Sequence, residues 1–324
     1  MSTGDKLTCA VVGLGRIGLG YDLAASESEV FSHTKAFMTH PGYELLAGAD
    51  PSAERRSEFE AFSRKPAYQN LTDLLSNCLP DVIAIAVPTE LHLPAVRDAA
   101  KDGVKLLLLE KPIALNTEEA SSIARIAGEK GIKLFVNYMR RCDPGLRELT
   151  TDIKRGFLGR PVAGRLIYCK GLFNNASHFL SLCIDWFGMP HSLQAAAPKR
   201  ASWSHNDLDI EFTLDYGEFT FSAQVARDDC YGIGEIDLFF ENGRVQLLDF
   251  GERIECFEVR DGKRNVRRLF PSGYKTQPQM SRYQYNVAEH IWSWLNGREV
   301  DIDSFRNAEL TLELCQRLAQ KAME

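Results

Sequence analysis

The sequence predicts an α/β protein. We expect a doubly wound, parallel-sheet domain at residues 1–137 and an α/β domain with an open, mostly antiparallel sheet at residues 138–324. Three observations predict this architecture. Strands and helices alternate through the first half of the chain. A glycine-rich turn directly follows the first strand. Beyond residue 138, extended runs are separated by Asp-Gly and Asn-Gly turns, which are hairpin signals.

Short apolar runs in the first half, stopped by a glycine, an acid or a proline, are typical of buried strands. These predicted strands are Leu7–Val12, Tyr43–Ala49, Pro66–Tyr68, Asp81–Val87, Val104–Leu109 and Ile132–Val136. Helical periodicity and capping residues fill the intervals between them. The predicted helices are Ala53–Phe62, Leu71–Asn77 (capped by Asn70 or Thr72), Leu93–Lys101 and Glu118–Lys130 (capped by Asn116 or Thr117).

The second half changes character. A helix is predicted at Pro144–Arg155, and helices are again predicted at Gln284–Leu295 and Ser304–Met323. The segment between the first two of these helices contains extended runs, which predict a mostly antiparallel meander. These runs are Val162–Lys170, Ser192–Ala197, Leu208–Asp215, Glu218–Ala226, Gly234–Glu241 and Arg244–Phe250.

Composition limits the possible partners. The net charge of −6 leaves no basic footprint for nucleic acid or a membrane surface. No apolar stretch is long enough to span a bilayer, and the short polar start Met1–Leu7 does not resemble a signal peptide. The 8 cysteines are scattered, so we expect reduced thiols in a cytoplasmic protein.

The motif Gly13-Leu14-Gly15-Arg16-Ile17-Gly18 follows the first strand. In such a turn the first glycine permits the tight bend, the second lets a pyrophosphate approach the backbone, and the third allows close packing. Free N–H groups at the start of the next helix would bind the phosphates. The motif therefore predicts a dinucleotide site.

Asp50 ends the second strand, where a carboxylate can accept hydrogen bonds from both ribose hydroxyls of NAD and would repel the 2′-phosphate of NADP. A helix N-cap is the other interpretation, because Pro51 could begin a helix. Asp50 follows Gly18 by more residues than the roughly 20 expected. We interpret Leu19–Phe31 as an insertion before a helix that begins near Ser32-His33. It either covers the cofactor phosphates or is a solvated loop.

Glu110-Lys111-Pro112 ends the strand that contains four consecutive leucines, Leu106 to Leu109. Pro112 has no N–H to continue the ladder, so a lysine and a glutamate stand at the carboxyl end of a buried strand. Ligands bind at that edge of open α/β sheets. The simpler alternative is a strand that ends in charges because it meets water.

These motifs carry a resemblance to a known family. Ala86-Val87-Pro88-Thr89-Glu90-Leu91-His92, then Glu110-Lys111-Pro112 and Asn137-Tyr138, resemble the glucose–fructose oxidoreductase/inositol dehydrogenase/MocA family over nearly the whole chain. The resemblance implies a Rossmann domain that binds NAD, an oligomer formed through the second domain, and hydride transfer at a sugar or polyol carbon. It implies that Lys111 touches both the nicotinamide ribose and the substrate hydroxyl. The cofactor contacts that it implies are Gly13, Gly15, Arg16, Ile17, Gly18, Asp50, Val87, Pro88, Thr89, His92, Glu110, Lys111 and Asn137.

The family's second catalytic element is an Asp-x-x-x-His segment, which Gly188 and Pro190 align with His178. Here Asn174 and Ser181 stand where the family has acids. Asn174-Asn175-Ala176-Ser177-His178 resembles the branch that acts on UDP-linked N-acetylated sugars at ring carbon 3. A packed helix-face histidine is the simpler interpretation of His178.

Further candidates follow Asn137. Tyr138, Arg140 and Arg141 lie where the family contacts substrate, and a guanidinium suits a phosphate of a nucleotide sugar. The alternative for the two arginines is an exposed helix start. His205, Asp207 and Asp209 alternate along one strand, but they lack a fourth ligand, so we predict no metal. Tyr283 and Tyr285 are interpreted as packing residues.

Together these residues predict an NAD-dependent dehydrogenase of a nucleotide-linked sugar. His178 would be the base, since its ordinary pKa lies near neutral pH. Lys111 would hold and polarise the hydroxyl, and the reverse assignment stays open. A free-sugar or inositol dehydrogenase, a redox-neutral NAD-dependent glycosidase and a non-catalytic NAD-binding sensor are the alternatives.

Overall fold

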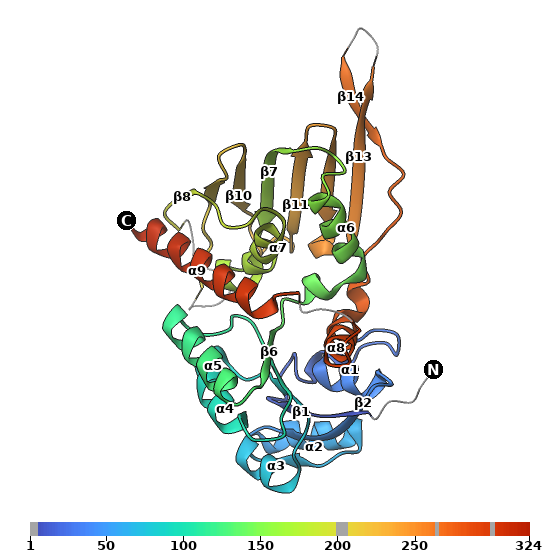
Figure 1. Ribbon diagram of the computed structural model, residues 1–324, viewed down its shortest axis with the longest axis vertical. Helices are drawn as coiled ribbons and strands as arrows, with labels where there is room; N and C mark the ends of the chain where they lie inside the picture. Colours follow the sequence, from blue (N-terminus) through green and yellow to red (C-terminus); the bar gives the residue numbers. More distant parts are fainter. Residues whose placement is uncertain (1–5, 199–206, 263–265, 299–301) are drawn as a thin grey trace. The chain divides into compact units, whose positions relative to one another are not determined.

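The chain forms two compact units, which we describe separately. The structure, a computed structural model, describes residues 6–198, 207–262, 266–298 and 302–324. Contacts divide the chain into Met1–Cys142 with Ser281–Glu309, and Asp143–Met280 with Leu310–Glu324 (Figure 1). The expectation that 138–324 is one domain is therefore wrong for Ser281–Glu309. This segment returns because Val287, Ala288 and Ile291 are buried in the core of the first unit.

The first unit contains a six-stranded sheet in the order β3-β2-β1-β4-β5-β6. All of its neighbouring strands are parallel. The strand order reverses between β1 and β4, which is the position where dinucleotides bind in doubly wound folds. The predicted fold class is confirmed. The strands are β1 Leu7–Val12, β2 Tyr43–Ala49, β3 Ala67–Tyr68, β4 Val82–Ile85, β5 Leu106–Leu109 and β6 Lys133–Val136.

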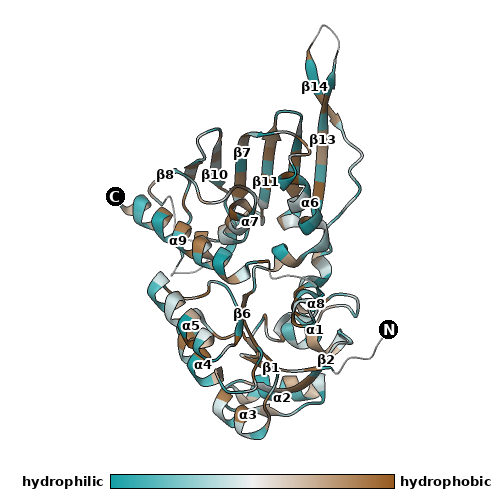
Figure 2. Cartoon of the chain, viewed as in Figure 1, coloured by the Kyte–Doolittle hydropathy of each residue, from teal (hydrophilic) through white to brown (hydrophobic). Residues whose placement is uncertain are grey.

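The helices of this unit are α1 His33–Thr39, α2 Ala53–Ser63, α3 Leu71–Asn77, α4 His92–Ala99, α5 Thr117–Glu129 and α8 Tyr283–Leu295. Asn70 and Asn116 cap α3 and α5, so one of the two predicted caps is confirmed for each helix. Strand β4 is shorter than predicted. Toward β1 its start is held by a side chain, because the Asp81 carboxylate accepts hydrogen bonds from the backbone N–H and hydroxyl of Thr8, while the Asp81 carbonyl accepts from Lys105 and Leu106. Figure 2 shows the apolar character of β1 and β2.

The second unit contains an eight-stranded sheet in the order β14-β13-β12-β11-β7-β10-β9-β8. It is mostly antiparallel, as predicted, but it is not a simple meander. β7 lies between β11 and β10 and pairs with β10 in parallel. The strands are β7 Pro161–Tyr168, β8 Ser192–Ala195, β9 Phe212–Asp215, β10 Thr220–Val225, β11 Gly234–Phe240, β12 Gly243–Leu248, β13 Arg253–Asp261 and β14 Arg267–Pro271.

One face of this sheet is covered by α6 Pro144–Lys154, α7 Ser177–Phe187 and the C-terminal part of α9 Ser304–Met323. Helix α7 was expected only in the alternative that places His178 on a packed helix face, and its bounds were not predicted, because it is apolar on nearly every side and this hides the 3.6-residue period. Strands β13 and β14 were also missed. They form a hairpin whose charged and apolar residues are visible as teal and brown bands in Figure 2. No helix in the described ranges is long and apolar enough to cross a membrane.

Candidate functional site

The glycine turn after β1 has the geometry that its motif predicts. Gly13 has φ +90°, and a Cβ there would lie 2.4 Å from the carbonyl oxygen of Ala86. A Cβ on Gly18 would lie 2.0 Å from the Gly13 carbonyl oxygen. Both positions therefore require glycine. A Cβ on Gly15 would meet nothing nearer than the Arg55 guanidinium at 3.7 Å, so this turn leaves room beside its second glycine for a phosphate.

Asp50 ends β2 and is 3 % exposed. Its carboxylate accepts hydrogen bonds from the backbone N–H groups of Leu14 and Ser52, both at 2.8 Å. The N-cap of α2 is Ser52, so the interpretation of Asp50 as the cap is wrong. Instead, Asp50 ties the glycine turn to the start of α2. The Arg55 guanidinium lies 3.5 Å from the same carboxylate.

Glu110 is the centre of a polar cluster at the carboxyl end of β5. One oxygen, Oε1, accepts a hydrogen bond from Asn137 Nδ2 at 2.7 Å and lies 2.8 Å from His33 Nε2. Asn137 also donates to the side chain of Gln284 on α8 at 3.2 Å. Sequence reasoning missed His33 and Gln284, because nothing in their local pattern indicates a partner far along the chain.

The electrostatics of this cluster keep Glu110 ionised. Burial raises the pKa of the Glu110 carboxyl, but the hydrogen bond and charge of His33, with Asn137 and Lys111, bring the pKa below its ordinary value. The other carboxylate oxygen lies 3.4 Å from the backbone nitrogen of Lys111. A fixed negative charge therefore directly precedes Lys111 in the chain.

The peptide bond between Lys111 and Pro112 is cis. The turn that contains it is held by the buried side chain of His92. Its ring nitrogens lie 3.0 Å from the Ile113 carbonyl oxygen and 3.1 Å from the Val87 carbonyl oxygen. Burial lowers the pKa of His92, although these contacts oppose the shift. The imidazole therefore links the ends of β4 and β5. Of the other predicted cofactor contacts nearby, Pro88 precedes the short helix Thr89–Leu91.

Tyr138, Arg140 and Arg141 are all buried, and the two arginines belong to the short helix Met139–Cys142. The alternative of an exposed helix start is wrong, since Arg140 is 4 % and Arg141 6 % exposed. The Arg141 guanidinium donates to the backbone carbonyl of Ile302. This contact gives Arg141 a structural partner inside the first unit.

The predicted residues of the second unit lie on one helical segment. Asn174 and Asn175 belong to a π-helical turn, Leu172–Ala176, which leads directly into α7. His178 is in the first turn of α7 and is 8 % exposed. Wider turns of this type are frequent at functional sites. Lys170 has φ +65° just before the turn, a conformation that residues other than glycine rarely adopt.

Two aspartates hold this turn. The Asp207 carboxylate accepts hydrogen bonds from the backbone N–H groups of Phe173 at 3.0 Å and Asn174 at 2.8 Å. Asp209 accepts one from Gly171 at 2.9 Å. The aspartates thus satisfy N–H groups that a helix start leaves without carbonyl partners. Sequence reasoning considered both only as metal ligands, together with His205, which lies outside the described residues.

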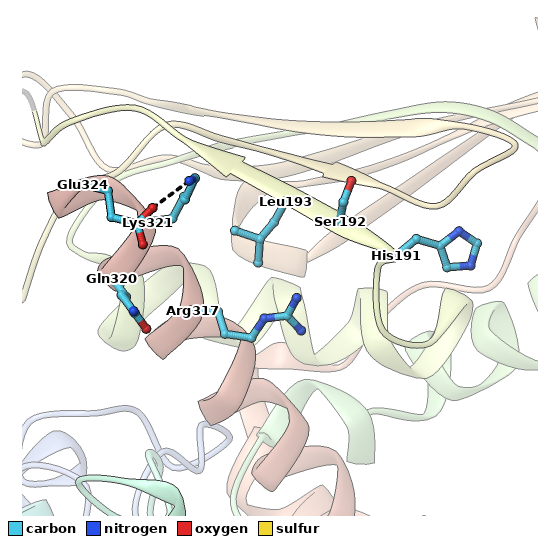
Figure 3. A pocket seen from close by; sticks show the side chains of 7 residues that line it. All are labelled: His191, Ser192, Leu193, Arg317, Gln320, Lys321 and Glu324. Atoms are coloured by element: carbon cyan, nitrogen blue, oxygen red, sulfur yellow. Dashed lines mark hydrogen bonds and ion pairs between the residues drawn. The ribbon is translucent and has the colours of Figure 1, made fainter.

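The second unit also has a surface groove of ≈ 390 Å³ beside β8 and α9. Figure 3 shows that its cationic side chains include Arg317 and Lys321, and that Lys321 pairs with Glu324. None of its seven lining residues is a predicted site residue. Among the described residues, no group of three or more His, Cys, Asp or Glu side chains is arranged to hold a metal ion.

Comparison with known proteins gives the family. The sequence model described as "Oxidoreductase family, NAD-binding Rossmann fold" matches residues 7–138. The scyllo-inositol 2-dehydrogenase (NAD(+)) of Bacillus subtilis is 31 % identical over 253 residues, which cover 72 % of this chain and 67 % of that protein. UDP-N-acetylglucosamine 3-dehydrogenase of Acidithiobacillus ferrooxidans is 34 % identical over 105 residues, 32 % of this chain and 33 % of the relative.

Solved structures share the whole fold. The WlbA dehydrogenase of Bordetella pertussis, crystallised with NADH and UDP-GlcNAcA, has a TM-score of 0.75 over 98 % of this chain and 97 % of its own, at 18 % identity. At that identity the likeness concerns the fold alone. The family model and the inositol dehydrogenase show that the chain belongs to the glucose–fructose oxidoreductase/inositol dehydrogenase/MocA family of oxidoreductases, whose Rossmann domain binds NAD.

Proposed function

We propose that the chain is an NAD-dependent dehydrogenase that oxidises a secondary hydroxyl of a sugar or cyclitol ring. The observation that carries the proposal is Lys111, which follows a buried, hydrogen-bonded carboxylate at the carboxyl end of β5. That edge of the parallel sheet also holds the glycine turn. A lysine in this setting is suited to hold a substrate hydroxyl beside a dinucleotide.

The cofactor is proposed to be NAD in preference to NADP. The residues fit the group, because the turn is closed at Gly13 and Gly18 and open at Gly15. The Asp50 carboxylate would face the adenosine ribose and repel a 2′-phosphate. Arg55 lies 3.5 Å from that carboxylate and is half exposed, so it weakens the repulsion without removing it. We expect kcat/KM for NAD⁺ to exceed that for NADP⁺ by at least about tenfold, and Asp50→Ser to reduce the ratio.

The proposed division of work follows from the charge of each group. Ionised Glu110 beside Lys111 favours the ammonium form of the lysine. An ammonium can donate to the substrate hydroxyl and stabilise negative charge that develops on its oxygen. His178 is then the proposed base, because a neutral imidazole can accept the hydroxyl proton. NAD⁺, when bound, supplies the acceptor for the hydride.

Two substrate classes have specific support. An inositol is favoured by the B. subtilis relative, whose match covers 67 % of its length. A UDP-linked N-acetylated sugar, oxidised at ring carbon 3, is favoured by the Asn174–His178 segment and by the name of the A. ferrooxidans relative. The two guanidinium groups that were expected to bind the phosphates of a nucleotide sugar are buried, and Arg141 donates to a backbone carbonyl. We therefore place the inositol class first.

A substrate panel tests the function. The purified chain is mixed with NAD⁺ and, separately, with scyllo-inositol, myo-inositol, N-acetylglucosamine and UDP-N-acetylglucosamine, and the absorbance of NADH is followed. Net NADH with one class identifies the dehydrogenase and its substrate. Product without net NADH would indicate a redox-neutral enzyme. Neither product nor NADH with any compound, although NADH binds, would contradict the proposal and favour a sensor.

Single substitutions test the assigned residues. Lys111→Ala and His178→Ala should each lower turnover at least about tenfold while NADH still binds. In a pH–rate profile, His178→Ala should remove the acidic limb if this histidine is the base. If Lys111→Ala removes that limb instead, the two roles are reversed. If neither variant loses activity, the assignment of the site is wrong.

Self-association is proposed through the second unit. The face of its sheet opposite α7 carries half-buried Phe239 and Phe257, with the Arg244 guanidinium 5.1 Å and 5.8 Å from their ring centroids. Arg244 also pairs with Asp237 at 2.6 Å. A sheet face that mixes aromatic side chains with paired charges is suited to a homo-oligomer.

A further inference from the structure

The helix that follows the glycine turn is interrupted by an insertion. The Ile17 carbonyl accepts a hydrogen bond from the His33 N–H at 3.0 Å, and the Gly18 carbonyl accepts one from the Thr34 N–H at 3.1 Å. In an uninterrupted α-helix these donors stand four residues further along the chain. Here each stands sixteen residues further, so twelve residues are inserted into one helix. This also explains why Asp50 lies so far from Gly18 in the sequence.

Asp22, inside the insertion, replaces the helix carbonyls that the interruption removes. Its buried carboxylate accepts hydrogen bonds from the N–H groups of Phe31 at 3.1 Å and Ser32 at 2.7 Å. Lys35 lies 3.9 Å from the same carboxylate and donates to the Ser26 carbonyl at 2.7 Å. The helix therefore resumes at α1 with its first N–H groups satisfied.

The restart places His33, the first residue of α1, against Glu110. The far end of the insertion is fixed as well, because the Val30 N–H donates to the Ser281 carbonyl at 3.0 Å and the Gln284 N–H donates to the Val30 carbonyl at 3.3 Å. Gln284 in turn contacts Asn137, the second partner of Glu110. Within the first unit, α1 and α8 lie side by side (Figure 1).

The outer part of the insertion is exposed to solvent, unlike its two ends. Tyr21 is 48 % and Leu23 is 45 % exposed, and residues 24–28 are exposed or half-buried, whereas Asp22 between them is buried. The buried Asp22 carboxylate instead accepts hydrogen bonds at the C-terminal end of the insertion, from Phe31 and Ser32, close to the start of α1.

We propose that the insertion is a brace: through Asp22 it positions His33, and thereby Glu110 and Lys111, and it does not serve as a cover over the cofactor phosphates. Asp22 is a positioning residue in this scheme. The inference goes further than the proposed function and depends on it only for the effect on turnover. The expected effects of Asp22 on hydrogen exchange and on NADH binding do not depend on which substrate the protein oxidises.

The test compares Asp22→Asn with Glu29→Gln in the full chain. Glu29 lies in the same loop and accepts hydrogen bonds from the N–H group of Ser26 at 3.0 Å and its hydroxyl at 2.9 Å, but it is only half-buried. Asp22→Asn should speed hydrogen exchange of the amides at 31–36 by at least about tenfold, because a charged acceptor of two buried N–H groups is weakened. NADH affinity, followed by fluorescence, should change less than about threefold.

Turnover gives the second readout. With the panel compound that the wild type oxidises, Asp22→Asn should lower kcat about five- to tenfold and leave KM for NAD⁺ nearly unchanged. Glu29→Gln should change neither. If Asp22→Asn does not fold, Ser32→Ala takes its place, since the Ser32 hydroxyl caps α1 by accepting from the Lys35 N–H at 3.2 Å. It should produce the same changes at smaller amplitude.

Two results would overturn the brace. One is a rise of the NADH Kd by about tenfold or more in Asp22→Asn with exchange at 31–36 unchanged, which would indicate a phosphate cover. The other is an equal effect of both variants on exchange. A wild type that oxidises no panel compound would refute the proposed function, while the exchange and NADH measurements would still decide between brace and cover.

Discussion

The most direct test of the second unit is Asp207→Asn. The Asp207 carboxylate, 7 % exposed, holds the π-helical turn before α7 through the N–H groups of Phe173 and Asn174. An asparagine keeps one acceptor oxygen, but its NH₂ group would face the other of these two N–H donors and cannot accept a hydrogen bond from it. Because a hydrogen bond to an ionised acceptor contributes about 1.5–3 kcal/mol, we expect the unit to lose about 2–3 kcal/mol of stability.

That loss corresponds to a fall in Tm of about 4–12 °C for a unit of this size. Differential scanning calorimetry is the appropriate assay, since two units can unfold in separate transitions. Hydrogen exchange should locate the effect at Phe173 and Asn174. Asp215→Asn is the matched control, because Asp215 is exposed and accepts from the Gly217 N–H at 2.8 Å within a turn. We expect it to change stability by less than about 1 kcal/mol.

The reasoning fails if both variants lower Tm equally, or if exchange at Phe173 and Asn174 is unaffected by Asp207→Asn. Either result would mean that the packing of α7 fixes the turn without the carboxylate. If the carboxylate does fix it, turnover should fall together with the local protection, because His178 follows the turn directly. Binding of NADH should remain unchanged.

Three further outcomes are expected. Gly13→Ala should abolish NADH binding and lower Tm, since its Cβ would lie 2.4 Å from a carbonyl oxygen, whereas Gly15→Ala should weaken NADH binding without lowering Tm. Asn137→Ala removes a donor from Glu110 and so raises the pKa of this carboxyl. In urea unfolding it should therefore cost about 1.5 kcal/mol at pH 7, and this difference should shrink below about pH 4.3 as the wild-type carboxylate is protonated. Phe239→Glu should lower the mass measured by light scattering if the open sheet face joins subunits, and an unchanged mass would contradict that interface.

The parallel sheet could be predicted because its information is local. Each strand is a short apolar run with a definite stop, so the ends of β1 and β2 were predicted to the residue. Helix α7 and the hairpin β13–β14 could not be predicted in the same way. The helix is apolar on nearly every side, and the hairpin buries only Ile254 and Cys256 at the start of β13, while β14 is exposed throughout and is held by its pairing with β13.

The candidate site also has features that local sequence predicts and features that depend on long-range contacts. Local sequence was enough to predict the glycine turn, the position of Asp50 and of Glu110-Lys111 at strand ends, and the position where a helix resumes after the insertion, because backbone sterics and strand ends depend on neighbouring residues. The packing of the fold was needed to show that His33 and Asn137 contact Glu110, that Gln284 contacts Asn137, and that Asp207 holds the turn before His178. Those contacts join residues far apart in the chain, and a hydrogen bond between distant residues leaves no periodic mark in the sequence. It exists only once the packing of helices and strands has brought donor and acceptor within 3 Å or so of each other.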